Sequence, residues 1–203
     1  MNTLSKIRRN AWVILAFGLL QTVRATPPEE TPQMQILFGF DEPTRAWDVI
    51  DDGVMGGLSR GSWKVEEGKG IFQGQLSLEN NGGFSSVRSA PLDSAPSGAT
   101  AFRLRVKGDG RRYQFRVRTD GNFDGVSYRA EFETTKDEWQ EVALELKAFA
   151  AVFRGNVLND YPPLSAERVV TVGFLLADKT QGAFRLEVEW IGALMPDSPS
   201  VAR

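Results

Sequence analysis

Two adjacent carboxylates in a glycine-rich stretch are the side chains with the clearest potential for chemistry. Asp51 and Asp52 lie within residues 47–59, a range that also contains Gly53, Gly56 and Gly57. A glycosidase needs two carboxyls about 5 to 9.5 Å apart across a cleft, but adjacent side chains of an extended chain point to opposite faces. Pairing Asp52 with Asp109 or Glu79 would be needed instead, and no spacing ties such a pair to a cleft. We therefore predict a tightly specified loop, whose carboxylates accept hydrogen bonds from loop amides, and no enzyme.

The chain contains no His and no Cys. This excludes zinc sites with the usual ligands, Ser-His-Asp and Cys-His nucleophiles, and disulfides. The formal net charge of -2 provides no excess of Lys and Arg for nucleic acid. A phosphate-binding loop would need a following helix and a Lys, whereas a strand pattern follows residues 47–59. We predict no cofactor and no nucleic-acid partner.

A calcium-loop pattern is formed by Asp120, Asn122 and Asp124, with Glu131 at the last position. An EF-hand needs a helix on each side, but both flanks of this loop alternate as strands do. We expect a turn between two strands and no metal, with calcium binding as the alternative.

A second glycine-rich cluster, residues 77–88, contains Asn81-Gly82, a strong hairpin-turn signal. Arg88 stands there among small and apolar residues, so a buried Arg88 would need a carboxylate, for which Asp51 or Asp52 would serve. A third cluster is predicted to form another hairpin turn: Gly108, Asp109 and Gly110.

Apolar and polar residues alternate with a period of two from residue 36 onward, as in half-buried strands. The four clearest segments are 101–107, 113–119, 126–133 and 183–191, and we expect them in one sheet. In the last segment the residues expected to face inward are Phe184, Leu186, Val188 and Trp190. The other predicted strands are 36–40, 47–50, 62–65, 70–78, 84–88, 139–146 and 169–177. These strands predict an all-β sandwich or jelly roll.

Residues 169–177 are apolar on both faces, so this strand should lie centrally and be covered on both sides. Short helical turns are expected only at 146–153 and 165–168. The outward arginines of the four clearest segments need opposite charges across from them. These arginines are Arg103, Arg105, Arg116 and Arg118. A solvated ion-pair lattice and a charged docking face for a protein are the two interpretations.

The N-terminal 25 residues have the pattern of a signal peptide. Lys6, Arg8 and Arg9 precede the apolar run 11–20, and Val23-Arg24-Ala25 fits a cleavage site. The run is shorter than the roughly 20 residues that span a bilayer, and too apolar for a mitochondrial transit peptide. We predict export to a periplasmic or extracellular location, a linker at 26–35, one domain at 36–194 and a tail at 195–203.

The runs WDVIDDGVMGGLSRGSW, FQGQLSLENNGGFSSVRS and VGFLLADKTQGAFRLEVEWI resemble the complex I intermediate-associated protein 30 family in order and spacing. The resemblance covers roughly residues 36 to 194. It implies a galactose-binding-domain-like β-sandwich and a non-enzymatic role, because the eukaryotic members are mitochondrial chaperones of complex I assembly intermediates. We expect a binding or assembly module with a protein partner in the cell envelope; a carbohydrate-binding module of the envelope is the alternative.

Candidate partner-binding residues are Trp47, Asp51, Asp52, Met55, Asn80, Asn81, Phe84 and Arg88. Residues expected to shape the loops are Gly53, Gly56, Gly57, Gly82, Gly83, Gly108, Asp109 and Gly110. Aromatics flanked by polar groups suit both proteins and sugars. The alternative interpretation is that these motifs only hold the sandwich together.

Overall fold

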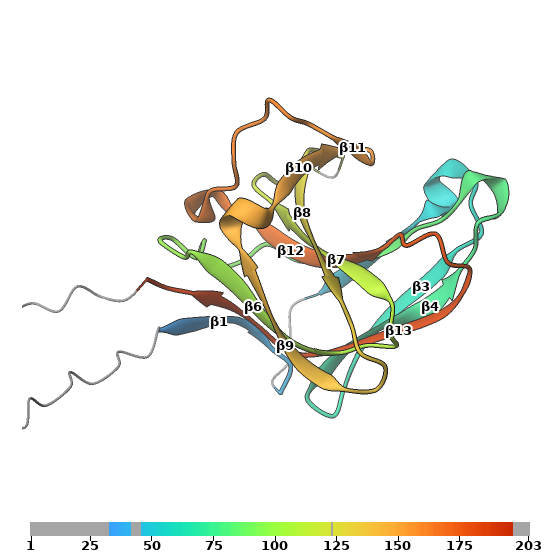
Figure 1. The fold of residues 1–203 in the computed structure, drawn as a ribbon, viewed down its shortest axis with the longest axis horizontal. Helices are drawn as coiled ribbons and strands as arrows, with labels where there is room; N and C mark the ends of the chain where they lie inside the picture. The colour runs from blue at the N-terminus through green and yellow to red at the C-terminus, as the bar shows by residue number, and fades with distance from the viewer. Residues whose placement is uncertain (1–32, 42–45, 123, 197–203) are drawn as a thin grey trace, which may run out of the picture. The chain divides into compact units, whose positions relative to one another are not determined.

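Two antiparallel sheets form the described part of the chain, which in this computed structural model covers residues 33–41, 46–122 and 124–196. Sheet A has the strand order β3 (Arg60–Glu66), β4 (Lys69–Leu76), β13 (Gly182–Leu194), β6 (Ala101–Lys107) and β9 (Trp139–Glu145), and β1 (Met34–Gly39) also pairs with β13 (Figure 1). Sheet B has the order β11 (Asn156–Val157), β10 (Ala150–Phe153), β8 (Ser127–Glu133), β7 (Arg112–Arg118), β12 (Thr171–Leu176), β5 (Ser85–Ser89) and β2 (Trp47–Asp51). The prediction of an all-β sandwich is confirmed. Strand β1 begins at Met34, within the range predicted as linker.

The core lies between the inner faces of the two sheets, where the alternating apolar side chains meet. Phe102 on β6 contacts Phe115 on β7 with ring centroids 5.3 Å apart, and Phe115 lies 5.5 Å from Phe174 on β12. All three rings are fully buried. Burying each such side chain stabilises the fold by about 1.5 to 3 kcal/mol. The period-two pattern therefore correctly identifies the inner face of these strands.

Helical structure in the described residues is limited to short 3-10 turns. They are η1 (Asp52–Met55), η2 (Glu79–Asn81), η3 (Leu146–Ala148) and η4 (Ala166–Arg168). The turn expected at 165–168 is confirmed as η4. Of the segment 146–153, only Leu146–Ala148 forms a turn, η3, and the prediction is wrong for Ala150–Phe153, which form strand β10. No helix in the described ranges has the length and apolarity needed to cross a membrane.

The four clearest alternating segments do not share one sheet. Strands β6 and β13 belong to sheet A, whereas β7 and β8 belong to sheet B. The expectation of one sheet is wrong because alternation reports which face of a strand is buried and not which strand lies beside it. The outward arginines are divided accordingly: Arg103 and Arg105 pair with Glu141 on sheet A, and Arg116 and Arg118 lie on sheet B.

Two predicted hairpin turns are connections between the sheets. The segment around Asn81-Gly82 joins β4 of sheet A to β5 of sheet B. Residues 108–111 likewise join β6 of sheet A to β7 of sheet B. Both hairpin predictions are wrong because the turn chemistry is compatible with any sharp reversal of the chain. Strand pairing is decided by the core that the two sheets share.

The alternation of β13 changes at a β-bulge between Val188 and Trp190. A bulge inserts one extra residue and exchanges the two faces of the strand beyond it. Ile191 is therefore fully buried, whereas Trp190 is only half-buried. The prediction that Trp190 faces inward is wrong for this reason.

Strand β12 lies between β7 and β5 in sheet B, so its predicted central position is confirmed. Val172, Phe174 and Leu176 are buried toward the core. Thr171 and Gly173, on the opposite face, are also buried, as predicted for a strand that is covered on both sides.

Candidate functional site

Two loops lie side by side at one end of the sheets, and one carboxylate joins them (Figure 1). We call residues 52–59 and 77–84 the loop pair. Asp52 is fully buried. Its Oδ1 accepts a hydrogen bond from Ser59 N at 2.9 Å. Its Oδ2 accepts three more, from Ser59 Oγ at 2.5 Å, Gly83 N at 2.6 Å and Phe84 N at 3.2 Å.

Glycines allow the loop backbones to approach the Asp52 carboxylate. A Cβ at Gly57 would lie 2.3 Å from Asp52 Oδ1, and a Cβ at Gly82 would lie 2.7 Å from Oδ2. Real Cβ atoms essentially never approach that closely. Gly57 and Gly82 therefore serve the loop pair by close approach, as the glycine-rich sequence predicts.

The Asp52 carboxylate is held in its charged form. Burial alone would raise its pKa, but the hydrogen bonds from Ser59, Gly83 and Phe84 outweigh that effect and the pKa lies below its ordinary value of 3.8. The loop pair is thus organised around a buried, ionised acceptor. Hydrogen bonds to a charged group are about twice as strong as neutral ones.

Asp51 joins strands rather than loops. Its Oδ2 accepts from Gly61 N on β3 at 2.8 Å, and its Oδ1 accepts from Ser85 Oγ on β5 at 2.6 Å. Because β3 belongs to sheet A and β5 to sheet B, Asp51 ties the two sheets together where the loop pair begins.

Arg88 lies opposite Asp48 in the pairing of β5 with β2. Burial lowers the Arg88 pKa and the negative charge of Asp48 opposes that shift. The suggestion that Asp51 or Asp52 partners Arg88 is wrong, because those carboxylates accept hydrogen bonds from the loop pair and from strands β3 and β5. The register of β2 and β5 instead places the charge of Asp48 across from Arg88.

Trp47 packs inside the sandwich. Its ring stacks on Trp63 with centroids 4.4 Å apart and contacts Phe38 edge-on at 5.0 Å. Only 9% of Trp47 is exposed. Phe84 is half-buried, and its backbone oxygen accepts a hydrogen bond from Asp52 N at 3.3 Å. Trp47 thus packs in the core, and Phe84 contributes a backbone hydrogen bond within the loop pair.

The loop pair exposes apolar side chains to solvent. We call four of them the apolar patch: Val54 (72% exposed), Met55 (63%), Leu58 (45%) and Leu78 (42%). Leu58 and Leu78 flank Ser59 and Ser77, which are joined by a hydrogen bond from Ser77 N to Ser59 Oγ at 3.0 Å. Met55 is a predicted site residue. The other three residues of the patch were missed, although apolar residues in a loop rich in glycine and polar residues were the available signal.

Asn80 and Asn81 are exposed beside the apolar patch. Their φ angles of 54° and 59° place both in the left-handed region. Asparagine tolerates this conformation better than most residues. The two side chains add polar groups at the edge of the loop pair.

The other glycine-rich connection is ordered by Asp109. Its carboxylate accepts from Tyr113 Oη at 3.1 Å and from Arg185 N at 2.8 Å. Gly108 forms an isolated bridge with Lys136. Here too an aspartate joins a loop to the neighbouring sheet.

The calcium-loop pattern joins β7 to β8, which pair antiparallel, so the predicted turn between strands is confirmed. Asp124 Oδ2 forms an ion pair with Arg154 Nη2 at 2.5 Å. Glu131 lies on β8 and accepts a hydrogen bond from Gln114 at 3.1 Å. Within the described ranges, no group of three or more acidic residues is arranged to hold a metal ion.

The sequence matches a known protein family over most of its length. The model of the family "Complex I intermediate-associated protein 30 (CIA30)" matches residues 36–188. The mouse mitochondrial complex I intermediate-associated protein 30 is 30% identical over 79% of this chain and 56% of its own length. The Drosophila melanogaster protein of that name is 24% identical over 81% of this chain and 63% of its own length. The chain thus matches less than two thirds of either relative.

Solved structures share the fold at low identity. A family 11 carbohydrate-binding module from Clostridium thermocellum, in complex with a mixed-linked tetrasaccharide, has a TM-score of 0.59 at 13% identity and covers 80% of this chain and 95% of its own. An agarase has a TM-score of 0.53 at 10% identity over 80% of this chain and 25% of its own. The predicted galactose-binding-domain-like sandwich is confirmed, and these likenesses show the fold alone.

The prediction of a periplasmic or extracellular location is wrong. The mouse and fly relatives are both mitochondrial proteins, which conflicts with export. The prediction rested on residues 1–25, which lie outside the described residues. A basic, acid-free N-terminus is common to signal peptides and transit peptides. The apolar run at 11–20 was not enough to distinguish one from the other.

Proposed function

Since the chain belongs to the complex I intermediate-associated protein 30 family, we propose that it is a non-enzymatic assembly module that binds a protein partner through the loop pair. The observation that carries the proposal is the apolar patch on loops fixed by Asp52. Exposed apolar residues that gather on a monomer are typical of protein-binding surfaces.

The loop pair combines a fixed backbone with a side chain, Met55, that can change its conformation. The backbone of the loop pair is ordered before binding by the four hydrogen bonds to Asp52, so little conformational entropy remains to be lost there. Met55 has a flexible, polarisable side chain that can adjust to an irregular partner surface. The exposed Asn80 and Asn81 supply a polar rim of the kind that surrounds apolar interface centres.

The family supports one class of partner. The mouse and fly relatives are named after complex I intermediates, and an incompletely assembled complex exposes apolar subunit surfaces that are buried later. We propose that the apolar patch covers such a surface on a complex I assembly intermediate.

The test is affinity capture from a membrane extract that contains complex I and its assembly intermediates. The bait is the full chain, compared with a Val54→Ser, Met55→Ser double variant. Because both side chains are largely exposed, the double variant should keep its melting temperature and lose capture about tenfold or more. The matched control is Val157→Ser, an apolar residue 45% exposed on β11, which should capture normally.

Equal capture by the double variant and by the Val157 control would contradict the use of the apolar patch. Carbohydrate binding is the second candidate, supported by the likeness to carbohydrate-binding modules. A glycan array probed with the same chain distinguishes the two candidates. Sugar binding without capture of any complex I subunit would replace the assembly proposal.

A further inference from the structure

The outer face of sheet B contains a hollow between positively charged side chains. It is lined by Arg88 on β5, by Arg116 and Arg118 on β7, and by Thr171 and Gly173 on β12. Gly173 lies opposite Arg88 on one side and opposite Arg116 on the other. A Cβ at Gly173 would lie 2.2 Å from the backbone oxygen of Val87, so the glycine lets β5 and β12 approach closely here. The hollow has a cavity volume of about 50 Å³.

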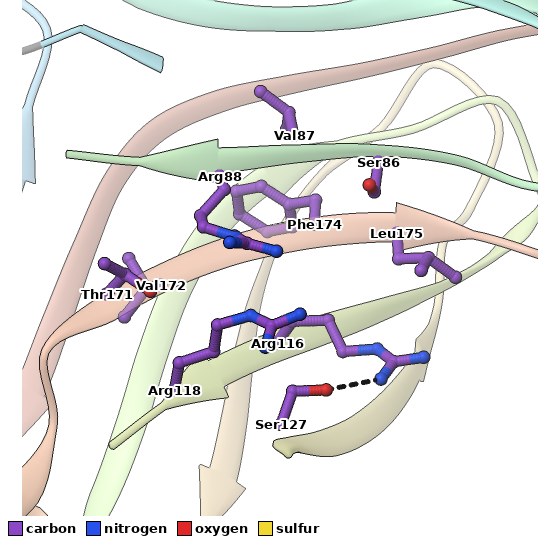
Figure 2. A pocket seen from close by; sticks show the side chains of 11 residues that line it. Ser86, Val87, Arg88, Arg116, Arg118, Ser127, Thr171, Val172, Phe174 and Leu175 are labelled. Carbon is purple, nitrogen blue, oxygen red and sulfur yellow. Dashed lines mark hydrogen bonds between the residues drawn. The ribbon is translucent and has the colours of Figure 1, made fainter. Parts of the chain in front are cut away.

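Figure 2 shows how the guanidinium groups approach this space. Arg88 and Arg118 extend toward β12 from the strands on either side of it, whereas Arg116 turns toward Ser127. Arg118 and Thr171 are directly opposite each other in the pairing of β7 with β12. Groups from three neighbouring strands therefore surround one point on the sheet.

The hydrogen bonds of two of these arginines go to neutral acceptors. Arg118 Nη1 donates to the backbone oxygen of Gly125 at 2.7 Å. Arg116 donates to Gln114 Oε1 at 2.7 and 3.0 Å and to Ser127 Oγ at 2.9 Å. No carboxylate lines the hollow in the described part of the chain. The side chains that line the hollow are thus cationic, hydroxyl-bearing or apolar, and Asp48, the carboxylate opposite Arg88 on β2, lies outside this lining.

The positively charged arginine side chains around the hollow repel one another. Burial and the positive charge of Arg88 together lower the pKa of Arg118 to about 10, although Asp120 and Asp124 oppose the shift. Burial also lowers the pKa of Arg116 to about 10, aided by Arg129 and Arg118. Both guanidiniums remain protonated at neutral pH. Like charges in a partly buried site are unfavourable and are relieved by an anion.

Thr171 provides an independent sign of a ligand. The residue is 6% exposed, and its buried Oγ1 has no hydrogen-bond partner within the described ranges. Buried hydroxyls are almost always hydrogen-bonded, and an exception calls for a specific explanation. A ligand oxygen in the hollow beside Thr171 would accept this hydrogen bond.

We propose that this hollow binds a phosphate group, with Arg88 and Arg118 as its charged partners, Thr171 as a neutral donor and Arg116 as a flanking cation. Guanidinium groups match phosphate oxygens in geometry and charge. Donors that approach from three strands suit a tetrahedral oxyanion better than a planar carboxylate. The cavity volume is about 50 Å³, whereas one water molecule needs roughly 10 to 15 Å³. The cavity therefore has room for one small oxyanion and not for a sugar chain. This site is separate from the loop pair and independent of the proposed function.

The experiment is isothermal titration of the full chain with inorganic phosphate at constant ionic strength, together with thermal melting. The wild type should show saturable binding and a rise in melting temperature. Arg118→Gln should weaken phosphate binding about tenfold or more, because it removes a charge-assisted hydrogen bond. Arg103→Gln, an arginine on the outer face of sheet A, is the matched control and should bind as the wild type does.

Thr171→Val separates ligand binding from folding. The substitution replaces an unsatisfied hydroxyl by a methyl group of similar size, so the melting temperature without phosphate should stay equal or rise. Phosphate binding should nevertheless weaken several-fold. Glycerol 3-phosphate tests whether a phosphate monoester is accepted as well as the free ion, and acetate tests a carboxylate.

Three results would overturn the proposal. They are the absence of saturable binding at millimolar phosphate, equal binding by the wild type and the Arg118 variant, and tighter binding of acetate than of phosphate. Since none of these measurements involves the apolar patch, failure here leaves the assembly proposal standing, and failure of partner capture leaves the phosphate site standing.

Discussion

Replacing Asp52 by Asn tests whether one buried charge holds the loop pair together. The amide can keep its single oxygen where Oδ2 now accepts from Ser59 Oγ, Gly83 N and Phe84 N. Its NH2 group then faces Ser59 N, which loses its acceptor at Oδ1. A buried donor without an acceptor costs about 1 to 3 kcal/mol, and the three remaining bonds each weaken by up to about 1 kcal/mol when the charge is lost. We expect Asp52→Asn to lower the free energy of unfolding by about 4 kcal/mol.

The matched control is Asp51→Asn. Its amide oxygen can accept from Gly61 N, and its NH2 group can donate to Ser85 Oγ, because a hydroxyl is both donor and acceptor. The hydroxyl hydrogen of Ser85 then has to turn away from residue 51, but only two hydrogen bonds depend on the Asp51 charge, against four at Asp52. We therefore expect Asp51→Asn to lower the free energy of unfolding by about 1 to 2 kcal/mol, clearly less than Asp52→Asn. Urea unfolding followed by circular dichroism measures both variants. In a domain of this size Asp52→Asn should lower the melting temperature by about 8 to 16 °C. Equal losses in the two variants, or a loss at Asp52 below about 1 kcal/mol, would refute the role of the charge.

The same pair of variants gives a pH dependence with a defined sign. Because the folded-state pKa of Asp52 lies below 3.8, its contribution is present above the unfolded pKa and is lost as pH falls through the folded pKa. The stability difference between the wild type and Asp52→Asn should therefore be constant near neutral pH and shrink from about pH 5 toward about pH 2. A difference that grows on acidification would contradict this assignment.

Two further predictions concern a mostly buried ion pair outside the loop pair and the close approach of Gly57 to Asp52. Asp178→Asn should lower the free energy of unfolding by about 3 kcal/mol, because Asp178 and Arg111 form a bidentate pair at 2.6 and 2.9 Å with side chains only 13% and 11% exposed. The control Glu189→Gln breaks an exposed ion pair and should lower it by less than about 1 kcal/mol in the same urea titration. Gly57→Ala should lower the free energy of unfolding by about 2 kcal/mol or more, because the new Cβ clashes with the Asp52 carboxylate. The control Gly53→Ala has no atom within 4 Å of its Cβ and should change the free energy of unfolding by no more than about 0.5 kcal/mol. Similar melting curves for the two glycine variants would contradict the close approach.

Local pattern predicted most of the strands and their inner faces, because burial imposes a period of two on each strand independently. Strands β10 and β11, with four and two residues, are too short to show that period and were not predicted. It did not predict which strands pair. Strands β6 and β7 are adjacent in sequence and alternate alike, yet they belong to different sheets. That choice depends on contacts between residues far apart in the sequence, which a period does not contain.

The candidate site was predictable in part for a related reason. Glycines beside Asp51 and Asp52 indicated a specified loop, and both carboxylates do accept hydrogen bonds from backbone amides. Asp51 and Asp52 were expected beside Arg88 because they are the acidic residues of the glycine-rich loop, but the strand register places Asp48 opposite Arg88. Thr171 had no signal in the sequence, since a threonine in an apolar strand becomes informative only when its missing partner is seen.

The position of β13 has a consequence for how the chain is made. This strand pairs with β1, β4 and β6 and so connects the centre of sheet A, yet it is the last strand of the described chain. During synthesis β4 and β6 therefore emerge from the ribosome long before the strand that joins them, with apolar faces uncovered. Long-range pairing of this kind slows folding and exposes intermediates to aggregation. A nascent chain arrested before residue 182 should consequently depend on chaperones until β13 is released.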